Sequence, residues 1–322
     1  MKIFVTGGAG YVGSICSEEL LNAGYEVVVF DNLTEGHRQA VDTRATFIQG
    51  DLLDRTFLSA TLLQVRPDAI MHFGAATLVP ESMSQPGKHF LNNVAGGVNL
   101  LDACVQAGVK KFIFSSTCAI FGIPDSPFLS EDLPKKPINP YGESKWMFER
   151  VLDWYNKLFG IDYVCLRYFN ASGATSKFGE HHNHETHLIP IVLQVALEQR
   201  PYVEIYGTDY PTPDGSCVRD YVHIVDLAQA HILALRYPES TVFNLGSGNG
   251  FSVKEVIETV RKVTGHAIPT KESPRRAGDP PKLVADSTKA RTKLGWKPRF
   301  ESVETIITTA WQWHKAHPKG YQ

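Results

Sequence analysis

The chain has 322 residues, of which 43% are hydrophobic and 20% charged, a composition typical of a folded globular protein and not of a disordered chain. Its 32 basic and 34 acidic residues give a net charge of −2, which argues against binding to nucleic acid or to an anionic membrane surface. No apolar stretch reaches the roughly 18 residues of a membrane-spanning helix, and the chain begins with a strand-like run instead of a signal peptide. Its five cysteines form no Cys-x-x-Cys pair and are expected to be reduced core thiols, so we expect a cytoplasmic protein.

Short apolar runs alternate with helix-like segments over the first half of the chain, a rhythm that predicts a parallel sheet covered by helices on both faces. The expected strands are residues 2–6, 26–30, 46–48, 69–73, 111–115 and 163–166. The expected helices are residues 12–23, 54–64, 93–107 and 142–159.

After about residue 168 the alternation of strands and helices becomes irregular, and we expect loops there. Helices are expected near residues 188–198, 225–234, 253–263 and 303–314. We therefore expect an α/β protein with two parts. The first, residues 1–168, is a doubly wound Rossmann-type parallel sheet. The second, residues 169–322, is a smaller substrate-binding α/β lobe, from which some segments return to the first part.

A glycine-rich segment directly follows the first expected strand, with Gly7, Gly10 and Gly13 in the spacing G-x-x-G-x-x-G. Glycine permits a tight turn there and lets backbone amides at a helix N-terminus approach a pyrophosphate. Asp31 ends the second expected strand, 18 residues after Gly13, where a carboxylate can accept hydrogen bonds from both ribose hydroxyls. These features predict an NAD site, because Asp31 would repel a 2′-phosphate, although Arg38 nearby leaves NADP open.

A tyrosine and a lysine, Tyr141 and Lys145, lie four residues apart in a helix that Pro140 is expected to open, so both occupy one face. A nearby ammonium group and the positive ring of nicotinamide would lower the pKa of the phenol and let it act as a base. In isolation such a pair would be two ordinary surface residues. Hydroxyl groups at residues 115–117 follow the fifth strand, at the sheet edge where ligands bind in this architecture. Asp51, after the third strand, either meets the adenine or caps a turn.

Further motifs follow one another almost from end to end of the chain. They are TGGAGYVG, DNL, SSTCAIFG, NPYGESK, RYFNASGA, ETHLIP, DGSCVRDYVH and RRAGDP. In these motifs the chain resembles the extended short-chain dehydrogenase/reductases and, within them, the UDP-glucose 4-epimerases. The resemblance implies NAD-dependent 4-epimerisation of a UDP-hexose through a transient 4-keto intermediate, with UDP-N-acetylhexosamines as possible further substrates.

The resemblance also implies roles for individual residues. Thr117, Tyr141 and Lys145 match the catalytic hydroxyl, base and lysine. The expected cofactor-binding set is Gly7, Gly10, Tyr11, Val12, Gly13, Asp31, Asn32, Leu33, Asp51, Leu52, Phe73, Asn92, Ser115, Tyr141, Lys145 and Tyr168. The expected substrate-binding set is Thr117, Tyr141, Asn170, His187, Leu188, Tyr206, Arg219, Tyr221, Arg276, Asp279 and Leu283.

Other activities are less well supported by the residues. Cys118 and Ala119 stand where related nucleotide-sugar dehydratases carry an Asp-Glu pair that helps to expel water, which disfavours dehydration. A 4-epimerase of a UDP-uronate or UDP-pentose stays open, although no arginine that could pair a uronate lies between Arg167 and Arg200. The third alternative is a non-catalytic NAD-sensing protein. Such a protein would not need both Tyr141 and Lys145, so their presence favours an enzyme.

The segment of residues 179–187 is rich in histidine and glutamate, which are common zinc ligands. The spacing of these residues does not match that of structural zinc sites, so we expect no metal and interpret the segment as a substrate loop. In the helices expected at residues 93–107 and 142–159, apolar residues exceed a single core stripe, among them Trp146, Phe148 and Trp154. Together with the resemblance, this excess indicates a homodimer.

Overall fold

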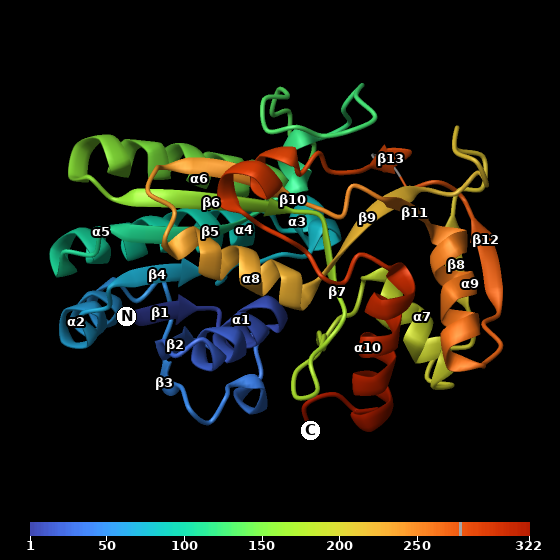
Figure 1. Cartoon of the computed structure of the whole chain (residues 1–322), viewed down its shortest axis with the longest axis horizontal. Helices are drawn as coiled ribbons and strands as arrows, with labels where there is room; N and C mark the ends of the chain where they lie inside the picture. Colours follow the sequence, from blue (N-terminus) through green and yellow to red (C-terminus); the bar gives the residue numbers. More distant parts are fainter. Residues whose placement is uncertain (277–278) are drawn as a thin grey trace.

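The computed structural model describes residues 1–276 and 279–322 and is built around a seven-stranded parallel sheet (Figure 1). The strand order is β10-β6-β5-β4-β1-β2-β3. The strands are β1 (Lys2–Thr6), β2 (Glu26–Asp31), β3 (Thr46–Gln49), β4 (Ala69–His72), β5 (Lys111–Thr117), β6 (Asp162–Tyr168) and β10 (Thr241–Leu245). The order reverses between β1 and β4, and open parallel sheets bind ligands beyond the carboxyl ends of their strands at such a switch point.

Helices cover both faces of the sheet and create two separate hydrophobic cores (Figure 1). On one face, α1 (Tyr11–Asn22) and α8 (Ile224–Leu235) pack against the sheet and against each other. On the other face, α2 (Arg55–Val65), α5 (Gly97–Ala107) and α6 (Pro140–Phe159) do the same. Because every central strand is buried on both sides, its sequence is an almost unbroken apolar run.

The longest of these helices, α6, has clear local signals at both ends. Asn139 caps its N-terminus by accepting a hydrogen bond from the backbone N–H of Gly142 at 2.8 Å, and Pro140 occupies the first turn. Gly160 ends the helix with φ at 64°, a left-handed conformation that glycine adopts without strain. These caps determine where the first turn of α6 begins, and Tyr141 lies in that turn.

The remaining segments form a second, smaller part at the carboxyl edge of the large sheet (Figure 1). One sheet contains β7 (Asn170–Ser172), β9 (Val218–His223), β11 (Gly250–Ser252) and β13 (Lys282–Leu283), and a second pairs β8 (Val203–Tyr206) with β12 (Thr270–Ser273). Helices α7 (Leu188–Ala196), α9 (Val253–Thr264) and α10 (Val303–Ala316) enclose a third core. Two short helices, α3 (Val79–Ser84) and α4 (Pro86–His89), precede a π-helical stretch, Phe90–Gly96, that leads into α5.

The expected fold class is confirmed, and each of the six predicted strands is present within two residues of its expected ends. The sequence does not predict β10, which joins the large sheet beside β6 although it lies far along the chain. Loops are also predicted where the structure has β7, β8, β9 and β11. These strands are short, and a run of three to six residues gives too little periodicity to separate a strand from a loop.

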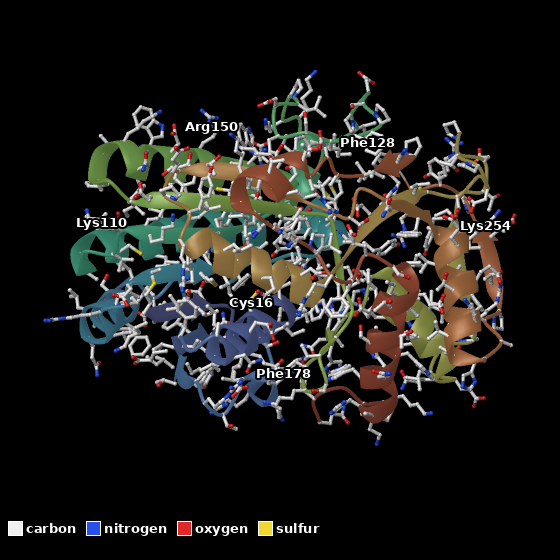
Figure 2. All side chains as sticks on the ribbon, in the orientation of Figure 1. Cys16, Lys110, Phe128, Arg150, Phe178 and Lys254 are labelled. Carbon is white, nitrogen blue, oxygen red and sulfur yellow. The ribbon has the colours of Figure 1, made fainter. Side chains whose placement is uncertain are left out.

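All five cysteines are free, as the sequence predicts. Cys16 lies inside the molecule on α1, whereas Lys110 and Arg150 lie at the surface (Figure 2). Within residues 1–276 and 279–322, no helix combines the length and the apolar character that crossing a membrane would need.

A buried ion pair joins α6 to the sheet. Arg167 on β6 donates from Nε to Glu149 Oε1 at 2.9 Å and from Nη2 to Oε2 at 2.6 Å, and only 2% and 4% of the two residues are exposed. Ser116 on β5 donates its hydroxyl to the same carboxylate at 2.6 Å. The carboxylate of Glu149 is therefore fully engaged, which is the condition under which a buried charge pair is tolerated.

We predict that Arg167→Met strongly destabilises the protein, because it leaves the Glu149 carboxylate buried without its counter-charge. The expected loss in free energy of unfolding is about 3–5 kcal/mol, measured by urea denaturation. The matched control is Asp153→Ala, which removes an exposed ion pair with Lys157 on the same helix and should cost less than about 1 kcal/mol. Equal losses in the two variants would contradict the role given to the buried pair.

Candidate active site

The glycine segment forms a tight turn between β1 and α1. Gly7 has φ at 71°, and a Cβ atom on it would lie 2.4 Å from the backbone nitrogen of Gly74 after β4. A Cβ on Gly13 would lie 2.2 Å from the carbonyl oxygen of Gly7, so α1 can approach the turn this closely only with glycine there. The N-terminus of α1, capped by Gly10, consequently lies at the carboxyl edge of the sheet.

Asp31 lies at the end of β2, beside this turn. Its Oδ2 accepts a hydrogen bond from the backbone N–H of Ala9 at 3.0 Å, and its Oδ1 accepts one from Leu33 at 2.8 Å. Burial raises the pKa of Asp31, and these two backbone donors oppose the rise. Leu33 has a positive φ of 62°, which turns the chain sharply after the carboxylate.

Asp51, which the sequence leaves undecided between a ligand contact and a turn, takes part in a turn. Its Oδ1 accepts a hydrogen bond from the backbone N–H of Leu53, and its Oδ2 accepts one from the Asn32 amide at 2.8 Å. Because Asn32 directly follows Asp31, this bond connects the ends of β2 and β3. Arg38 lies over the ring of Phe47 with its Cζ 4.5 Å from the ring centroid, a cation–π contact within the protein.

The remaining predicted cofactor residues lie at the ends of neighbouring strands or on the helices that follow. Tyr11 donates its hydroxyl to the carbonyl oxygen of Gly173 at 2.6 Å and so connects α1 to the chain after β7. Phe73, after β4, packs against His231 of α8, with ring centroids 4.9 Å apart. Leu52 and Val12 are buried or partly buried, and Asn92 lies in the π-helical stretch before α5.

Tyr141 and Lys145 lie one helical turn apart at the start of α6, as their spacing predicts, with Lys145 Nζ 6.0 Å from the centroid of the tyrosine ring. Lys145 is 2% exposed, and its Nζ donates to the carbonyl oxygen of Ser115 at 2.9 Å. The hydroxyls of Ser115 and Tyr168 are hydrogen-bonded to each other. Thr117, the last residue of β5, pairs in register with Tyr168 at the end of β6.

Burial has opposite effects on the two ionisable groups. It lowers the pKa of Lys145 to about 7, and the nearby Glu149 carboxylate opposes this shift. Burial raises the pKa of Tyr141 to about 12, and a hydrogen bond with Thr117 opposes this rise. The sequence predicts a lowered pKa for the phenol, but the protein groups around Tyr141 hold it protonated, because loss of hydration outweighs the hydrogen bond.

A cavity of about 440 Å³ lies in the second part of the chain among α7, β8 and β9, a size typical of pockets for small ligands. Asn170, two residues after the end of β6, lines this cavity. Eight of the residues predicted to bind substrate line this cavity. They are Asn170, His187, Leu188, Tyr206, Arg219, Tyr221, Arg276 and Asp279.

Two arginines in this cavity already have partners within the protein. Arg219 donates to Asp279 Oδ1 at 3.4 Å and to the carbonyl oxygen of Pro280 at 2.9 Å. The guanidinium of Arg276 lies over the ring of Tyr206, with its Cζ 3.9 Å from the centroid. Both groups keep donors for an anion, since a guanidinium carries five N–H bonds.

Three predicted substrate residues, Thr117, Tyr141 and Leu283, are not in the lining of this cavity. Leu283 pairs with Arg219 between β13 and β9, and it packs with Cys118 on the small hydrophobic cluster around Phe121 and Phe169. It is therefore next to one residue that lines the cavity, Arg219, and packs on the same cluster as Cys118, which directly follows Thr117.

The cavity is also lined by residues that the sequence does not single out. Arg200, Pro201 and Tyr202 contribute one wall, just after the end of α7, and Glu204 follows them on β8. Nothing in the sequence marks these residues, and only the folded chain brings them to the same cavity as Arg219 and Tyr221 of β9. Arg200 itself lines the cavity, so the absence of an arginine between Arg167 and Arg200 does not count against a UDP-uronate as substrate.

Comparisons with known proteins agree with this geometry. The family model described as the NAD dependent epimerase/dehydratase family matches residues 3–246. The UDP-glucose 4-epimerase of Lacticaseibacillus casei is 52% identical over 327 residues, covering 100% of this chain and 99% of that protein.

Two solved structures are also similar to this chain. The UDP-glucose 4-epimerase from Brucella ovis in complex with NAD is 43% identical, with a TM-score of 0.94 and coverage of 96% of this chain and 97% of the other. The UDP-Glc/GlcNAc 4-epimerase from Campylobacter jejuni is 42% identical, with a TM-score of 0.87 and coverage of 98% and 99%.

Proposed function

The chain belongs to the NAD dependent epimerase/dehydratase family and catalyses NAD-dependent 4-epimerisation of UDP-glucose, and we propose that Tyr141, Lys145 and Thr117 carry out the chemistry. The observation that carries this proposal is the position of Tyr141 and Lys145 on one turn of α6, at the sheet edge where Thr117 ends β5. A hydroxyl, a phenol and a buried ammonium group at one strand end are the groups that a reversible proton transfer requires.

The glycine turn fits a dinucleotide, because Gly7 and Gly13 leave no room for a Cβ and the N-terminus of α1 points at the same space. We propose that residues 1–168 hold the dinucleotide through this turn and Asp31, and that residues 169–322 hold most of the UDP-sugar. Bound NAD would supply reversible hydride transfer at carbon 4 of the sugar.

Tyr141 would take the proton of the sugar 4-hydroxyl and return it after the 4-keto sugar has turned over. The positive charge of Lys145, fixed by its hydrogen bond to the Ser115 carbonyl, favours the phenolate that this step needs. Thr117 would hold the sugar oxygen through its hydroxyl. Arg219 and Arg276 would bind the pyrophosphate, since a guanidinium supplies paired donors to phosphate oxygens.

All five free thiols support a reducing compartment, and we propose that the protein works in the cytoplasm. Cys104 is fully buried, and burial raises the pKa of the partly buried Cys118 thiol to about 12. Such thiols remain protonated at neutral pH, so they are poor nucleophiles and exchange disulfides slowly.

We further propose a homodimer in which α5 and α6 form the interface. Trp154 and Leu158, one turn apart on α6, are 59% and 66% exposed, and Val105 on α5 is 36% exposed. Of the other apolar residues that the sequence counts as surplus, Phe148 is fully buried in the core and Trp146 packs on a smaller cluster. The proposed interface therefore depends on Trp154 and Leu158.

Wild-type protein is expected to show the light-scattering mass of two chains at micromolar concentration. Trp154→Glu combined with Leu158→Glu should give the mass of one chain, because charges replace the apolar contact. Leu233→Glu, an equally drastic change at a 37% exposed residue of α8, serves as the control and should stay dimeric. A monomeric wild-type protein would contradict the dimer.

Tyr141→Phe should lower kcat about 100- to 10,000-fold, the usual contribution of a general acid-base group, while the fold is kept. The measurement is steady-state conversion of UDP-galactose to UDP-glucose. The control is Tyr155→Phe on the same helix, which removes a hydroxyl that donates to Asp102 and should leave kcat nearly unchanged. Turnover close to wild type in Tyr141→Phe would rule out the phenol as the base.

The breadth of substrates depends, we propose, on Leu283. A leucine beside the hexose is smaller than a tyrosine and lacks its hydroxyl, so it leaves room for a 2-acetamido group. Its pairing with Arg219, which lines the cavity, and its packing on the same cluster as Cys118 support this role. The similar protein from Campylobacter jejuni acts on both UDP-Glc and UDP-GlcNAc, which supports the same breadth here.

We predict that wild-type protein epimerises both UDP-glucose and UDP-N-acetylglucosamine, and that Leu283→Tyr selectively loses the second activity. Overfilling a packed site costs about 1–3 kcal/mol, so the ratio of the two kcat/KM values should change roughly 10- to 100-fold. Leu283→Met, which conserves volume, is the control and should keep the wild-type ratio. Rejection of the acetamido sugar by wild type, or its equal use by the tyrosine variant, would refute the idea.

A further inference from the structure

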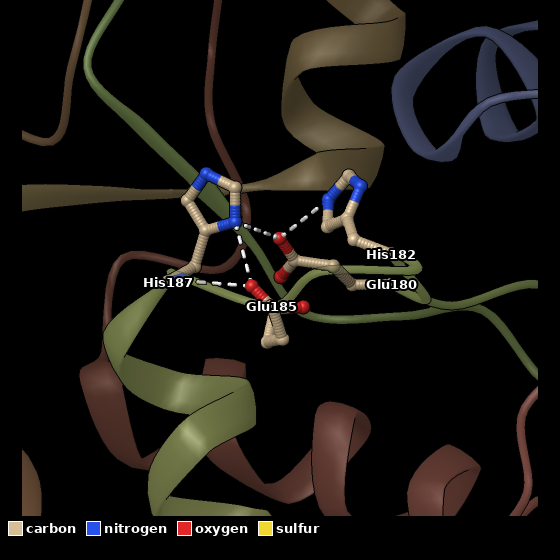
Figure 3. Close-up of side chains that lie close together, drawn as sticks. All are labelled: Glu180, His182, Glu185 and His187. Carbon is tan, nitrogen blue, oxygen red and sulfur yellow. Dashed lines mark hydrogen bonds and ion pairs between the residues drawn. The ribbon is translucent and has the colours of Figure 1, made fainter. Parts of the chain in front are cut away.

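Four side chains from one loop meet just before α7 (Figure 3). They are Glu180, His182, Glu185 and His187, so the loop contains the pattern Glu-x-His twice. Each residue offers one possible ligand atom, and these four atoms all lie within 4.8 Å of one another. Two carboxylate oxygens and two imidazole nitrogens therefore point at one small volume.

The distances in this cluster are close to those of a metal complex. Glu180 Oε1 lies 3.2 Å from His182 Nε2 and 2.9 Å from His187 Nδ1. Glu185 Oε1 lies 2.9 Å from the same His187 nitrogen. Four ligands at bond lengths of about 2.0–2.2 Å around a tetrahedral ion would be about 3.3–3.6 Å apart, so separations that reach at most 4.8 Å would have to close by no more than about 1.5 Å.

The charges of the cluster also favour a cation. The side chains of Glu180 and Glu185 are only 6% and 4% exposed, although both are carboxylates. Within the parts of the chain that the structure describes, the cationic partners of these two carboxylates within 4.0 Å are the imidazoles of the cluster. Buried carboxylates are normally paired with full charges or bound to metals, and a divalent ion would supply both charges at once.

We propose that Glu180, His182, Glu185 and His187 bind one divalent transition-metal ion, with Zn²⁺ as the best match. Imidazole nitrogen and carboxylate oxygen are both established zinc ligands, whereas Mg²⁺ and Ca²⁺ prefer all-oxygen sites. Four protein ligands leave no open position for a water or a substrate, so the ion has a structural role.

The loop is placed where such an ion would stabilise the cavity. His181, inside the loop, stacks on His37 of the first part of the chain with ring centroids 4.5 Å apart. At its other end the loop continues into α7, and Thr186 and His187 line the cavity. If Nδ1 of His187 binds the ion, Nε2 remains available on the other side of the ring, so metal binding and a substrate contact by His187 are compatible (Figure 3).

The test is a Zn²⁺ titration of the full chain after treatment with a chelator, in competition with a chromophoric zinc indicator. Wild type should bind one ion per chain. His182→Ala and Glu180→Gln should each weaken affinity more than about 100-fold, since losing only an outer partner of a ligand costs about 10- to 100-fold. His184→Ala is the matched control, because His184 is an exposed histidine of the same loop outside the cluster and should keep wild-type affinity.

A second measurement, the thermal midpoint, distinguishes loss of zinc binding from misfolding of a variant. Zn²⁺ should raise the thermal midpoint of wild type and of His184→Ala but not that of Glu180→Gln, which keeps the shape of the side chain. A millimolar excess of Mg²⁺ should not displace the zinc.

The proposal is overturned if wild type and His182→Ala bind zinc equally weakly, or if His184→Ala loses affinity as much as the cluster variants, which would indicate an adventitious ion only. Neither readout depends on epimerase activity, so this result and that of the Tyr141 test are independent.

Discussion

The parallel direction of all seven strands constrains where a site can form, because every strand delivers its last residue to the same edge of the sheet. Gly7, Asp31, Thr117 and Tyr168 are all at or just beyond strand ends, although they are spread over more than half of the chain. Their meeting depends on the close approach of α1 to β1, which a single methyl group on Gly13 would prevent. From this edge the chain continues through Asn170, which lines the cavity, so the same edge of the sheet borders both the proposed cofactor site and the proposed substrate site.

The burial of Lys145 is costly for stability and useful for chemistry. An ammonium group that is almost fully enclosed loses its hydration, and its hydrogen bond to the Ser115 carbonyl replaces only part of it. Burial therefore lowers the pKa of Lys145 to about 7, and the Glu149 carboxylate opposes this shift. Glu149 lies one turn further along α6 and pairs with Arg167 of β6 and Ser116 of β5, so the charged face of this helix is kept inside the protein by partners on the sheet.

How much could be predicted from the sequence depends on how local each signal is. The glycine spacing, the aspartate at the end of β2 and the four-residue spacing of Tyr141 and Lys145 are properties of a single turn, strand or helix, and the structure has each of them as predicted. The strand β10 and the cavity wall at Arg200 depend on pairing between segments far apart in the chain, for which periodicity carries no signal. Phe148 illustrates the same limit, since an apolar residue on a helix faces the core or the solvent according to what packs on it.

The histidine loop extends this point from strands to side chains. Spacing rules for zinc sites describe ligands held by hairpins and helix turns, and the segment of residues 179–187 has neither. Here the direction of the loop is determined by contacts outside it, namely the stacking of His181 on His37 and the hydrogen bond between Tyr321 and the backbone N–H of Gly179 at 3.0 Å. These contacts hold the N-terminal end of the loop, and its other end continues into α7, so its two Glu-x-His pairs converge on one small volume. The sequence shows that the segment is rich in possible zinc ligands, but only the positions of the four side chains in the folded chain show that their ligand atoms converge.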